Sequence, residues 1–518
     1  MYQDRDRGNN EDATLPTVAL RRRRRYLARR LIVTIAFHPD LSRVGESTAI
    51  SMEACRAGIE VGRGMPLFSR HPSGEEQMGV PLADAYISRR ALFLQVREGT
   101  LLVERPADAS LVNVSGQALD SGMTFPAQRL TTGVPVVLSN RIVLLVQEQD
   151  FELPPAHEPQ HLGLLVGSSL YMRHLRSQIE SLQRSGVDVL LTGETGTGKG
   201  EVARALHMGS DGPFIALNMS TLTAGLAAAT LFGAERGAYT GADHKRVGYF
   251  QQASGGTLFM DEVGDTAADV QPQLLRALEE REVQVVGGAV VRVELRVIAA
   301  SDIDLENSDS FRSALRFRLA RHTLSLRPLR EHKEDIGELC LAFIEELSEP
   351  LFVGLQQLDP IAHAMWADLM GAFLRYDWPG NIRELRNAIS EVVHQSDGKL
   401  PRVPPSILDA VNARNRTSEQ IRERTADDFD DAQLKSELER QDWEVTAAAR
   451  VLGISRSALN RRVARMPDVR QAMDIPASEI REVLDDCADD LTSAAKRLRI
   501  SRAALAQRLR TIDMEDGD

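Results

Sequence analysis

Cysteine, long apolar runs and net positive charge are scarce or missing in this 518-residue chain. The three cysteines (Cys55, Cys340 and Cys487) lie far apart and form neither a disulfide framework nor a metal-ligand pattern, which favours a reducing, cytoplasmic setting. No apolar run reaches the roughly 20 residues that a membrane helix needs, and the polar N-terminus lacks a secretory signal. The net charge of -12 argues against nucleic-acid binding by the whole surface and leaves that role to local patches.

The length favours several domains, because a single hydrophobic core stops growing at about 250–300 residues. Short apolar runs separated by Gly, Pro, Asp and Ser fill residues 30–150 and predict a β-sandwich. A Pro-rich linker follows at 151–163, and strands then alternate with helices over 164–395, which predicts an α/β domain that ends in a helical part. We expect a disordered tail over 1–29, a flexible tether over 396–429 and an all-α C-terminus.

A phosphate-binding loop is predicted within VDVLLTGETGTGKGEVARALH, at 187–207. An apolar strand, a glycine-rich turn and an amphipathic helix follow one another there, which is the context that such a loop requires. Backbone N–H groups at the turn can surround phosphate oxygens, and Lys199 can reach the β- and γ-phosphates. ATP is therefore the expected ligand, and its candidate contacts are Gly193, Glu194, Thr195, Gly196, Thr197, Gly198, Lys199 and Gly200.

Carboxylates follow a second apolar strand, in GGTLFMDEVGD at 255–265. Asp261 is suited to hold Mg²⁺, and Glu262 is suited to polarise the attacking water. Gly200 stands where a Ser or Thr often binds the metal, so Mg²⁺ must depend on other groups. A third strand, in RVIAASDIDL at 296–305, should deliver Asp302 beside the γ-phosphate.

Two further motifs supply arginines. YDWPGNIRELRNAI at 376–389 predicts a turn into a helix that Asn381 caps, with Arg383 in the first turn facing the phosphates. FRSALRFRL at 311–319 places Arg312 and Arg318 near one helical face. Arginines on a surface are usually solvated, and the residues alone leave that interpretation open.

With these motifs and LFGAERGAYTGA at 231–242, the segment 164–395 resembles the AAA+ domain of bacterial enhancer-binding proteins, the activators of sigma-54 RNA polymerase. The resemblance implies a hexameric ATPase that drives promoter melting, in which Arg312 and Arg318 reach a neighbour's nucleotide. It also implies that Tyr239 and Thr240 form the tip of a sigma-54 contact made by Gly237, Ala238, Tyr239, Thr240, Gly241 and Ala242. Three residues depart from the family pattern: Tyr239 replaces Phe, Asp302 replaces Asn, and Ala314 replaces an acid.

The C-terminus contains an internal repeat. TAAARVLGISRSALNRRV at 446–463 recurs as TSAAKRLRISRAALAQRL at 492–509, with 10 of 18 positions identical. Both copies lack Asp and Glu and have helix-turn-helix patterning, and the first resembles the Fis-type DNA-binding domain. We therefore expect units at 430–466 and 475–512 that bind double-stranded DNA. Arg499 replaces Gly453 in the second turn, so a helical packing unit stays an alternative there. The candidate DNA contacts are Arg456, Ser457, Asn460 and Arg461 in the first copy, and Arg502 and Gln507 in the second.

GRG at 62–64, PLADAYISRRALF at 81–93 and VNVSG at 112–116 give the N-terminal region its resemblance to a forkhead-associated (FHA) domain. Members of that family bind phosphothreonine peptides, and Arg63 and Ser88 match their phosphate contacts, with Arg89 beside them. Ala91 replaces the usual His, and the expected Asn residues are Ser110 and Ser115. The resemblance implies control by a phosphothreonine protein or a Ser/Thr kinase; the alternative is a sandwich that binds proteins without phosphate.

Together these features predict a cytoplasmic, ATP-dependent activator of sigma-54 RNA polymerase that binds DNA. A regulator that binds ATP and DNA without driving sigma-54 is the main alternative, and Asp302 and Tyr239 are the residues that favour it. An AAA+ unfoldase or helicase loader is a third interpretation, although neither activity needs the repeat or the GAYTGA sequence.

Overall fold

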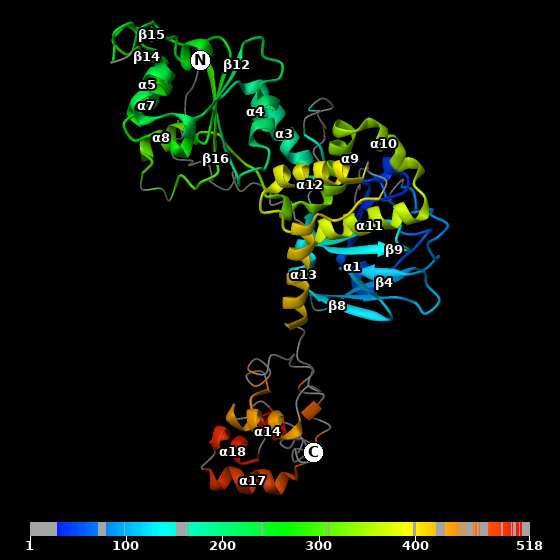
Figure 1. Cartoon of the computed structure of the whole chain (residues 1–518). Coiled ribbons are helices and arrows are strands. Elements are labelled where there is room, and N and C mark those ends of the chain that lie inside the picture. The colour runs from blue at the N-terminus through cyan, green and yellow to red at the C-terminus, as the bar shows by residue number, and fades with distance from the viewer. Residues whose placement is uncertain are drawn as a thin grey trace, which may run out of the picture. The chain divides into compact units, whose positions relative to one another are not determined.

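The computed structural model of the chain divides into two compact units, Met1–Val411 and Asn412–Asp518 (Figure 1). The structure describes residues 28–70, 79–97, 99–151, 162, 165–239, 242–306, 308, 310–396, 400–420, 430–441, 443–445, 448, 451, 459, 462–463, 466, 475–487, 490–498, 500, 504–506 and 508–509. The predicted disordered tail therefore lies almost wholly outside the described residues. In the part of the chain covered by these ranges, no helix has the length and apolar character needed to span a membrane.

The N-terminal region is a sandwich of two antiparallel sheets, as the alternating apolar runs predicted (Figure 1). One sheet has the strand order β2-β1-β10-β9-β6-β7 and the other has the order β3-β4-β5-β8. Leu31, Val33 and Ile35 alternate along β1 into the core between the sheets. The strands are β1 (Ala28–Phe37), β2 (Ser47–Ser51), β3 (Ile59–Val61), β4 (Leu92–Arg97), β5 (Thr100–Glu104), β6 (Val112–Val114), β7 (Gln117–Ala118), β8 (Gly122–Pro126), β9 (Val134–Leu138) and β10 (Ile142–Phe151), and the short helices are α1 (Met52–Ala57) and α2 (Ala127–Thr132).

The central domain is built on a parallel five-stranded sheet of order β12-β13-β16-β11-β17, which agrees with the predicted α/β alternation. Its core strands are almost wholly apolar because helices cover both faces of the sheet. The elements are α3 (Leu170–Ser185), β11 (Val189–Thr192), α4 (Lys199–His207), β12 (Phe214–Asn218), α5 (Ala224–Phe232), α6 (Tyr249–Gln252), β13 (Thr257–Asp261), α7 (Gln271–Glu280), the hairpin β14 (Glu282–Gln284) and β15 (Val290–Arg292), β16 (Arg296–Ser301), α8 (Ser313–Leu319) and β17 (Thr323–Ser325).

A helical lid follows the sheet. It comprises α9 (Ile336–Leu347), α10 (Glu349–Gly354), α11 (Pro360–Arg375), α12 (Asn381–Ser396) and α13 (Pro405–Gln420). The last helix corrects the sequence prediction, which treated 396–429 as a flexible tether. Pro405 begins α13, and Ile407 and Val411, one turn apart, are buried in the lid core. Residues 421–429 lie outside the described part of the chain.

The C-terminal unit repeats every 46 residues. Helix α14 (Asp431–Arg440) and helix α17 (Ala477–Asp486) have bounds that differ by 46 at both ends, although the similarity detected in the sequence began only at 446. Ala448 N donates to Glu444 O at 3.0 Å, and Ala494 N donates to Asp490 O at 3.0 Å in helix α18 (Leu491–Leu498), again at this spacing. Each copy has its own small core, in which Leu434, Leu438, Ala448 and Leu459 correspond to Ile480, Leu484, Ala494 and Leu505.

Candidate nucleotide site and its associated loops

The glycine-rich turn between β11 and α4 has the shape of a phosphate-binding loop. Gly193, Gly196 and Gly198 have φ angles of 150°, 81° and 93°, a region that residues with a Cβ rarely adopt. Lys199 begins α4 and is only 6% exposed. Its Nζ donates to Gly193 O at 2.8 Å, so the ammonium group lies inside the curl of the loop, where phosphates would replace that carbonyl as its partner.

Three carboxylates meet this loop at the C-terminal ends of β13 and β16. Thr195 Oγ1 in the loop donates to Asp302 Oδ2 at 2.7 Å, and this hydrogen bond lowers the pKa of Asp302. Burial is the largest cause, and a hydrogen bond to Asp302 the second, of a rise in the pKa of Glu262 to about 7. Lys199 opposes that rise by its positive charge. Asp261 ends β13 directly before Glu262, so the adjacent parallel strands bring the predicted residues to one edge of the sheet.

The loop is also fastened to the lid, which sequence reasoning missed. Arg330 Nη1 donates to Glu194 Oε2 at 2.8 Å, and this hydrogen bonding is the largest cause that lowers the pKa of Glu194 to about 2. Ile382 N donates to Gly196 O at 2.9 Å from the start of α12. A Cβ added to Gly196 would lie 2.3 Å from Gly380 O, so the close approach of the two segments requires glycine at 196.

Asn381 does not have the predicted role of helix cap. Its side chain is fully buried, and its backbone has a φ of 53°. Asn381 Oδ1 accepts from Leu329 N at 2.8 Å, while Nδ2 donates to Thr195 O at 3.0 Å and to Glu194 at 3.2 Å. Asn381 therefore joins the phosphate-binding loop to two segments of the lid.

The three predicted arginines have different environments. Arg383 is exposed at the start of α12, and its backbone N donates to Gly196 O at 3.3 Å, so it lies next to the loop as expected. Arg312 is exposed at the N-terminus of α8. Arg318 is half-buried, and its Nη2 donates to Leu278 O at 2.7 Å and pairs with Asp188 at 3.2 Å within its own chain.

Backbone hydrogen bonds hold the base of the loop that is predicted to contact sigma-54. Gly237 N donates to Ala242 O at 2.8 Å and Ala242 N donates to Tyr239 O at 3.0 Å, which closes a tight loop with Tyr239 half-buried. Before the loop, Glu235 N donates to Val286 O at 3.0 Å, beside the β14–β15 hairpin, and Ala238 lies against Gly287. Thr240 and Gly241 lie outside the described residues.

At the sandwich, the loops that carry the predicted phosphate contacts lie together. Arg63 N donates to Ser88 O at 3.0 Å. Ser88 Oγ accepts from Ser110 N at 2.8 Å, which fixes the Ser88 hydroxyl. Arg63 is half-buried and Arg89 is exposed. The predicted DNA contacts Arg456, Ser457, Asn460, Arg461, Arg502 and Gln507 all lie outside the described residues.

Comparison with known protein families identifies most of the chain. Residues 165–325 match the sigma-54 interaction domain, residues 330–420 match the AAA+ ATPase lid domain, and residues 425–466 match the bacterial regulatory protein, Fis family. These matches confirm the central domain, its lid and the first helix-turn-helix of the sequence prediction. They do not include the sandwich or the second C-terminal copy.

Among curated relatives, the chain is 35% identical over 385 residues to the C4-dicarboxylate transport transcriptional regulatory protein DctD of Pseudomonas aeruginosa, covering 69% of this chain and 79% of that one. It is 39% identical over 328 residues to the transcriptional regulatory protein ZraR of Salmonella typhimurium, covering 62% of this chain and 72% of ZraR. A crystal structure of NtrX from Brucella abortus in complex with ADP aligns with a TM-score of 0.43 at 28% identity, over 58% of this chain and 69% of NtrX.

At 35% identity over 79% of the length of DctD, this chain and DctD are members of one family. The match to the sigma-54 interaction domain spans the phosphate-binding loop, the carboxylate strands and the 237–242 loop. The chain therefore belongs to the sigma-54-dependent bacterial transcriptional regulators, with their sigma-54 interaction domain, AAA+ ATPase lid and Fis-family C-terminus.

Proposed function

We propose that this protein hydrolyses ATP in a ring, a hexamer when active, and uses that cycle to press the 237–242 loop against sigma-54 RNA polymerase in the cytoplasm. One observation carries the proposal. In a chain with a sigma-54 interaction domain, Lys199, Glu262 and Asp302 meet at the edge of one sheet, and the lid brings Arg383 to the same loop.

The residues present fit a nucleoside triphosphate and Mg²⁺. Lys199, Arg383 and the N–H groups at the start of α4 supply positive charge and donors for phosphate oxygens. Among the described residues no cluster of three His, Cys, Asp or Glu side chains could hold a metal by itself. Mg²⁺ commonly depends on one or two carboxylates and the substrate phosphates, so Asp261 is a sufficient protein ligand. The ion would neutralise phosphate charge during transfer.

Of the two arginines expected to reach a neighbouring subunit, we assign that role to Arg312. It is exposed at the start of α8, whereas Arg318 would have to leave Asp188 and the carbonyl of Leu278. An arginine supplied by a neighbour can raise hydrolysis by about 10³–10⁵-fold, so assembly and activity would be linked.

The test is transcription in vitro from a sigma-54 promoter with an upstream binding site for this protein. Open complexes should form with ATP and should not form with ADP. If the protein binds ATP and its DNA site but gives no open complexes, it is the regulator that does not drive sigma-54, the alternative that Asp302 and Tyr239 left open.

We also propose that the second C-terminal copy binds DNA like the first. The shared 46-residue period of helix bounds, hydrogen bonds and core positions supports a second three-helix unit, and residues 491–512 carry Arg and Lys without Asp or Glu. Two units in one chain would engage two stretches of duplex, which strengthens binding by raising the effective concentration of the second.

Substituting one arginine in each copy tests this proposal. Arg502→Ala should weaken DNA affinity about 5–100-fold and shorten the footprint on one side, the loss expected for one base or phosphate contact. Arg456→Ala, the matched change in the first copy, should shorten the opposite side. Gel-shift titrations and footprints at fixed salt measure both. An Arg502→Ala protein with unchanged affinity and footprint would make the second copy a helical packing unit.

For the sandwich we propose control by a phosphothreonine-containing partner, such as a substrate of a Ser/Thr kinase. The backbone contact between Arg63 and Ser88, and the hydrogen bond that holds the Ser88 hydroxyl at Ser110, support it, because arginine and hydroxyl groups in neighbouring loops are suited to a phosphate dianion. Arg63→Ala should weaken binding of a phosphothreonine peptide library at least about 10-fold, and Arg97→Ala should not. Isothermal titration compares the two variants with the wild-type protein. An unchanged isotherm for Arg63→Ala would exclude Arg63 as a phosphate contact.

A further inference from the structure

The outer face of the central strands of the larger sandwich sheet, β1, β9 and β10, is buried near Phe37, Val137 and Val143. Along β10, Ile142, Leu144 and Val146 point into the sandwich core, while Val143 and Leu145 belong to a second core. The same alternation occurs in β9, where Val137 faces away from Val136. Both faces of these strands are buried, which explains why β9 and the first part of β10 are continuous apolar runs.

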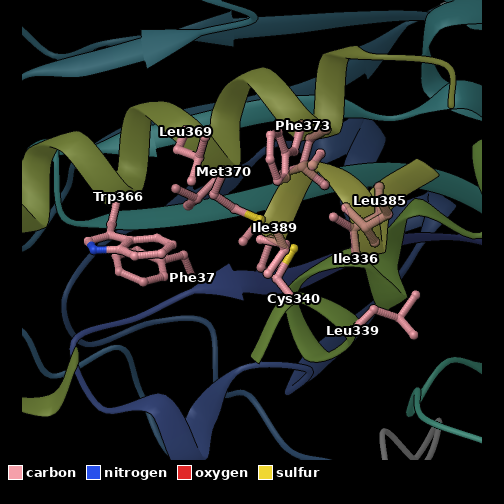
Figure 2. Packing of buried hydrophobic residues seen from close by; sticks show 14 of the residues in the cluster. Phe37, Ile336, Leu339, Cys340, Trp366, Leu369, Met370, Phe373, Leu385 and Ile389 are labelled. Atoms are coloured by element: carbon pink, nitrogen blue, oxygen red, sulfur yellow. The ribbon is translucent and has the colours of Figure 1, made fainter. Parts of the chain in front are cut away.

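The second core is that of the lid. Phe37, Val143 and Val137 are cross-strand partners in one row over β1, β10 and β9, and each is less than 5% exposed. They pack in one cluster with Ile336, Leu339, Cys340 and Ile344 of α9 and with Trp366, Leu369, Met370 and Phe373 of α11. Figure 2 shows Phe37 among these lid side chains. Domain interfaces within a chain are usually more polar than this, and a large apolar one opposes relative motion.

The backbones of the lid helices and of the sandwich strands also approach each other closely. A Cβ added to Gly337, in the first turn of α9, would lie 2.3 Å from Ala36 O, so the helix contacts the backbone of β1 directly. A Cβ added to Gly371 in α11 would lie 3.5 Å from Val137 Cγ2. At both places the lid approaches the sheet at a glycine, and a larger side chain at 337 would force them apart.

Polar contacts surround the apolar row. Gln149 Nε2 of β10 donates to Glu334 Oε1 at 3.0 Å, and Arg70 pairs with Glu338 Oε1 at 3.1 Å. Ser168, before α3, donates its Oγ to Gly45 O of the sandwich at 3.0 Å and to Glu338 Oε2 at 2.7 Å. The sandwich, the lid and the segment that leads into the ATPase sheet therefore share one hydrogen-bonded boundary.

The loop that carries the candidate phosphate contact Ser88 is bonded to the turn between β9 and β10. Ser139, in the turn between β9 and β10, donates its Oγ to Tyr86 O at 2.8 Å, and Arg141 pairs with Asp84 at 3.1 Å. Asp84 and Tyr86 lie in the loop that carries Ser88. A partner held by that loop would thus be linked, through the turn between β9 and β10, to the strands that pack against the lid.

We propose that the sandwich is a fixed part of the lid and moves with it as one body through the nucleotide cycle. On this basis, which rests on the ATPase proposed above, a partner bound to the sandwich acts by changing the position of the lid at the phosphate-binding loop, where Arg330 and Asn381 hold Glu194. The sandwich is then not a detachable inhibitor whose removal frees the motor.

A reversible lock across the interface tests this directly. In full-length protein with Cys487→Ser, the pair Val137→Cys and Gly371→Cys places one thiol on β9 and one on α11, where a Cβ at 371 would lie 3.5 Å from Val137 Cγ2. With an added thiol oxidant as electron acceptor, the pair should oxidise nearly completely, at the same rate with and without a non-hydrolysable ATP analogue. The oxidised protein should keep its ATPase and open-complex rates within about twofold of the reduced protein, because a disulfide between parts that do not separate changes little. The two single-cysteine variants are the controls.

Other results would overturn the proposal. A rate of disulfide formation that the ATP analogue changes by more than about 10-fold would show that the two surfaces separate during the cycle. A change in activity of more than about 10-fold on oxidation, reversed by reductant, would show that the sandwich must leave the lid for the cycle to proceed. If the unmodified chain lacks ATPase, the proposed function fails, whereas the oxidation rates still decide whether the two parts move together.

Discussion

Replacement of Glu262 by glutamine should lower the rate of ATP hydrolysis by about 100-fold or more, while ATP affinity stays within about threefold of the wild-type value. Glutamine keeps the shape and hydrogen-bonding capacity of the side chain but cannot accept a proton from water. Glu262 directly follows β13 and lies near Lys199, and the expected phosphate contact is Lys199 and not Glu262, so ATP binding should survive. Steady-state ATPase and nucleotide titrations measure the two quantities.

Asp265 provides a matched control. It is an exposed acid three residues further along the same segment, so Asp265→Asn makes the same chemical change away from the loop. That variant should keep hydrolysis within about twofold, as for most surface substitutions. A Glu262→Gln protein that still hydrolyses ATP at a comparable rate would show that another group activates the water.

The pH profile should report on the same carboxyl. Because burial, with Asp302 next, raises the pKa of Glu262 to about 7, part of the protein carries a protonated and inactive Glu262 at neutral pH. Hydrolysis should therefore rise as pH increases through about 7 and level off above it. Asp302→Asn removes the negative charge of Asp302 but not the burial of Glu262, so the midpoint of the rise should move to lower pH.

Replacement of Tyr239 by alanine should reduce open-complex formation by about 30-fold or more while leaving ATPase within about twofold, since an aromatic anchor at an interface commonly contributes 2 kcal/mol or more. The base of the loop is held by backbone hydrogen bonds at Glu235 and Ala242, which do not involve the Tyr239 ring. The substitution should thus remove the contact with sigma-54 and keep the motor intact. Abortive transcription and ATPase assays on the same preparation separate the two.

Tyr239→Phe is the control for this experiment. It keeps the ring and restores the residue that is usual in this family, so transcription should stay close to the wild-type level. If Tyr239→Ala also transcribes normally, the loop is not the contact, and the regulator that acts without driving sigma-54 becomes the better interpretation.

Three motifs of the nucleotide site could be predicted because each follows a buried strand. Parallel strands end at a common edge, so the residues after β11, β13 and β16 had to meet once the sheet formed. The C-terminal repeat could also be predicted, because small and branched apolar residues recur there at a spacing of 46 residues. Its first helices, α14 and α17, share few identities and became recognisable only through their common bounds.

Long-range pairings could not be predicted. The partner of Glu194 lies 136 residues away at Arg330, and nothing in either local sequence indicates the other. Asn381 is of a residue type that often caps helices. Its backbone has a positive φ, however, and its buried side chain contacts the phosphate-binding loop instead. The tether prediction failed because Ile407 and Val411 are the only buried positions among residues 405–413 of α13, too weak a periodicity to outweigh the polar composition.

The burial of β9 and β10 on both faces also limits how these strands can evolve. A strand with one wet face can vary at every second position, since a polar replacement there costs little. At residues 134–138 and 142–147 every position is buried, so neighbouring sites should be equally intolerant and drift should be possible only through compensating changes in the lid. Related genes that lost the sandwich would therefore need a lid with a more polar α9 and α11.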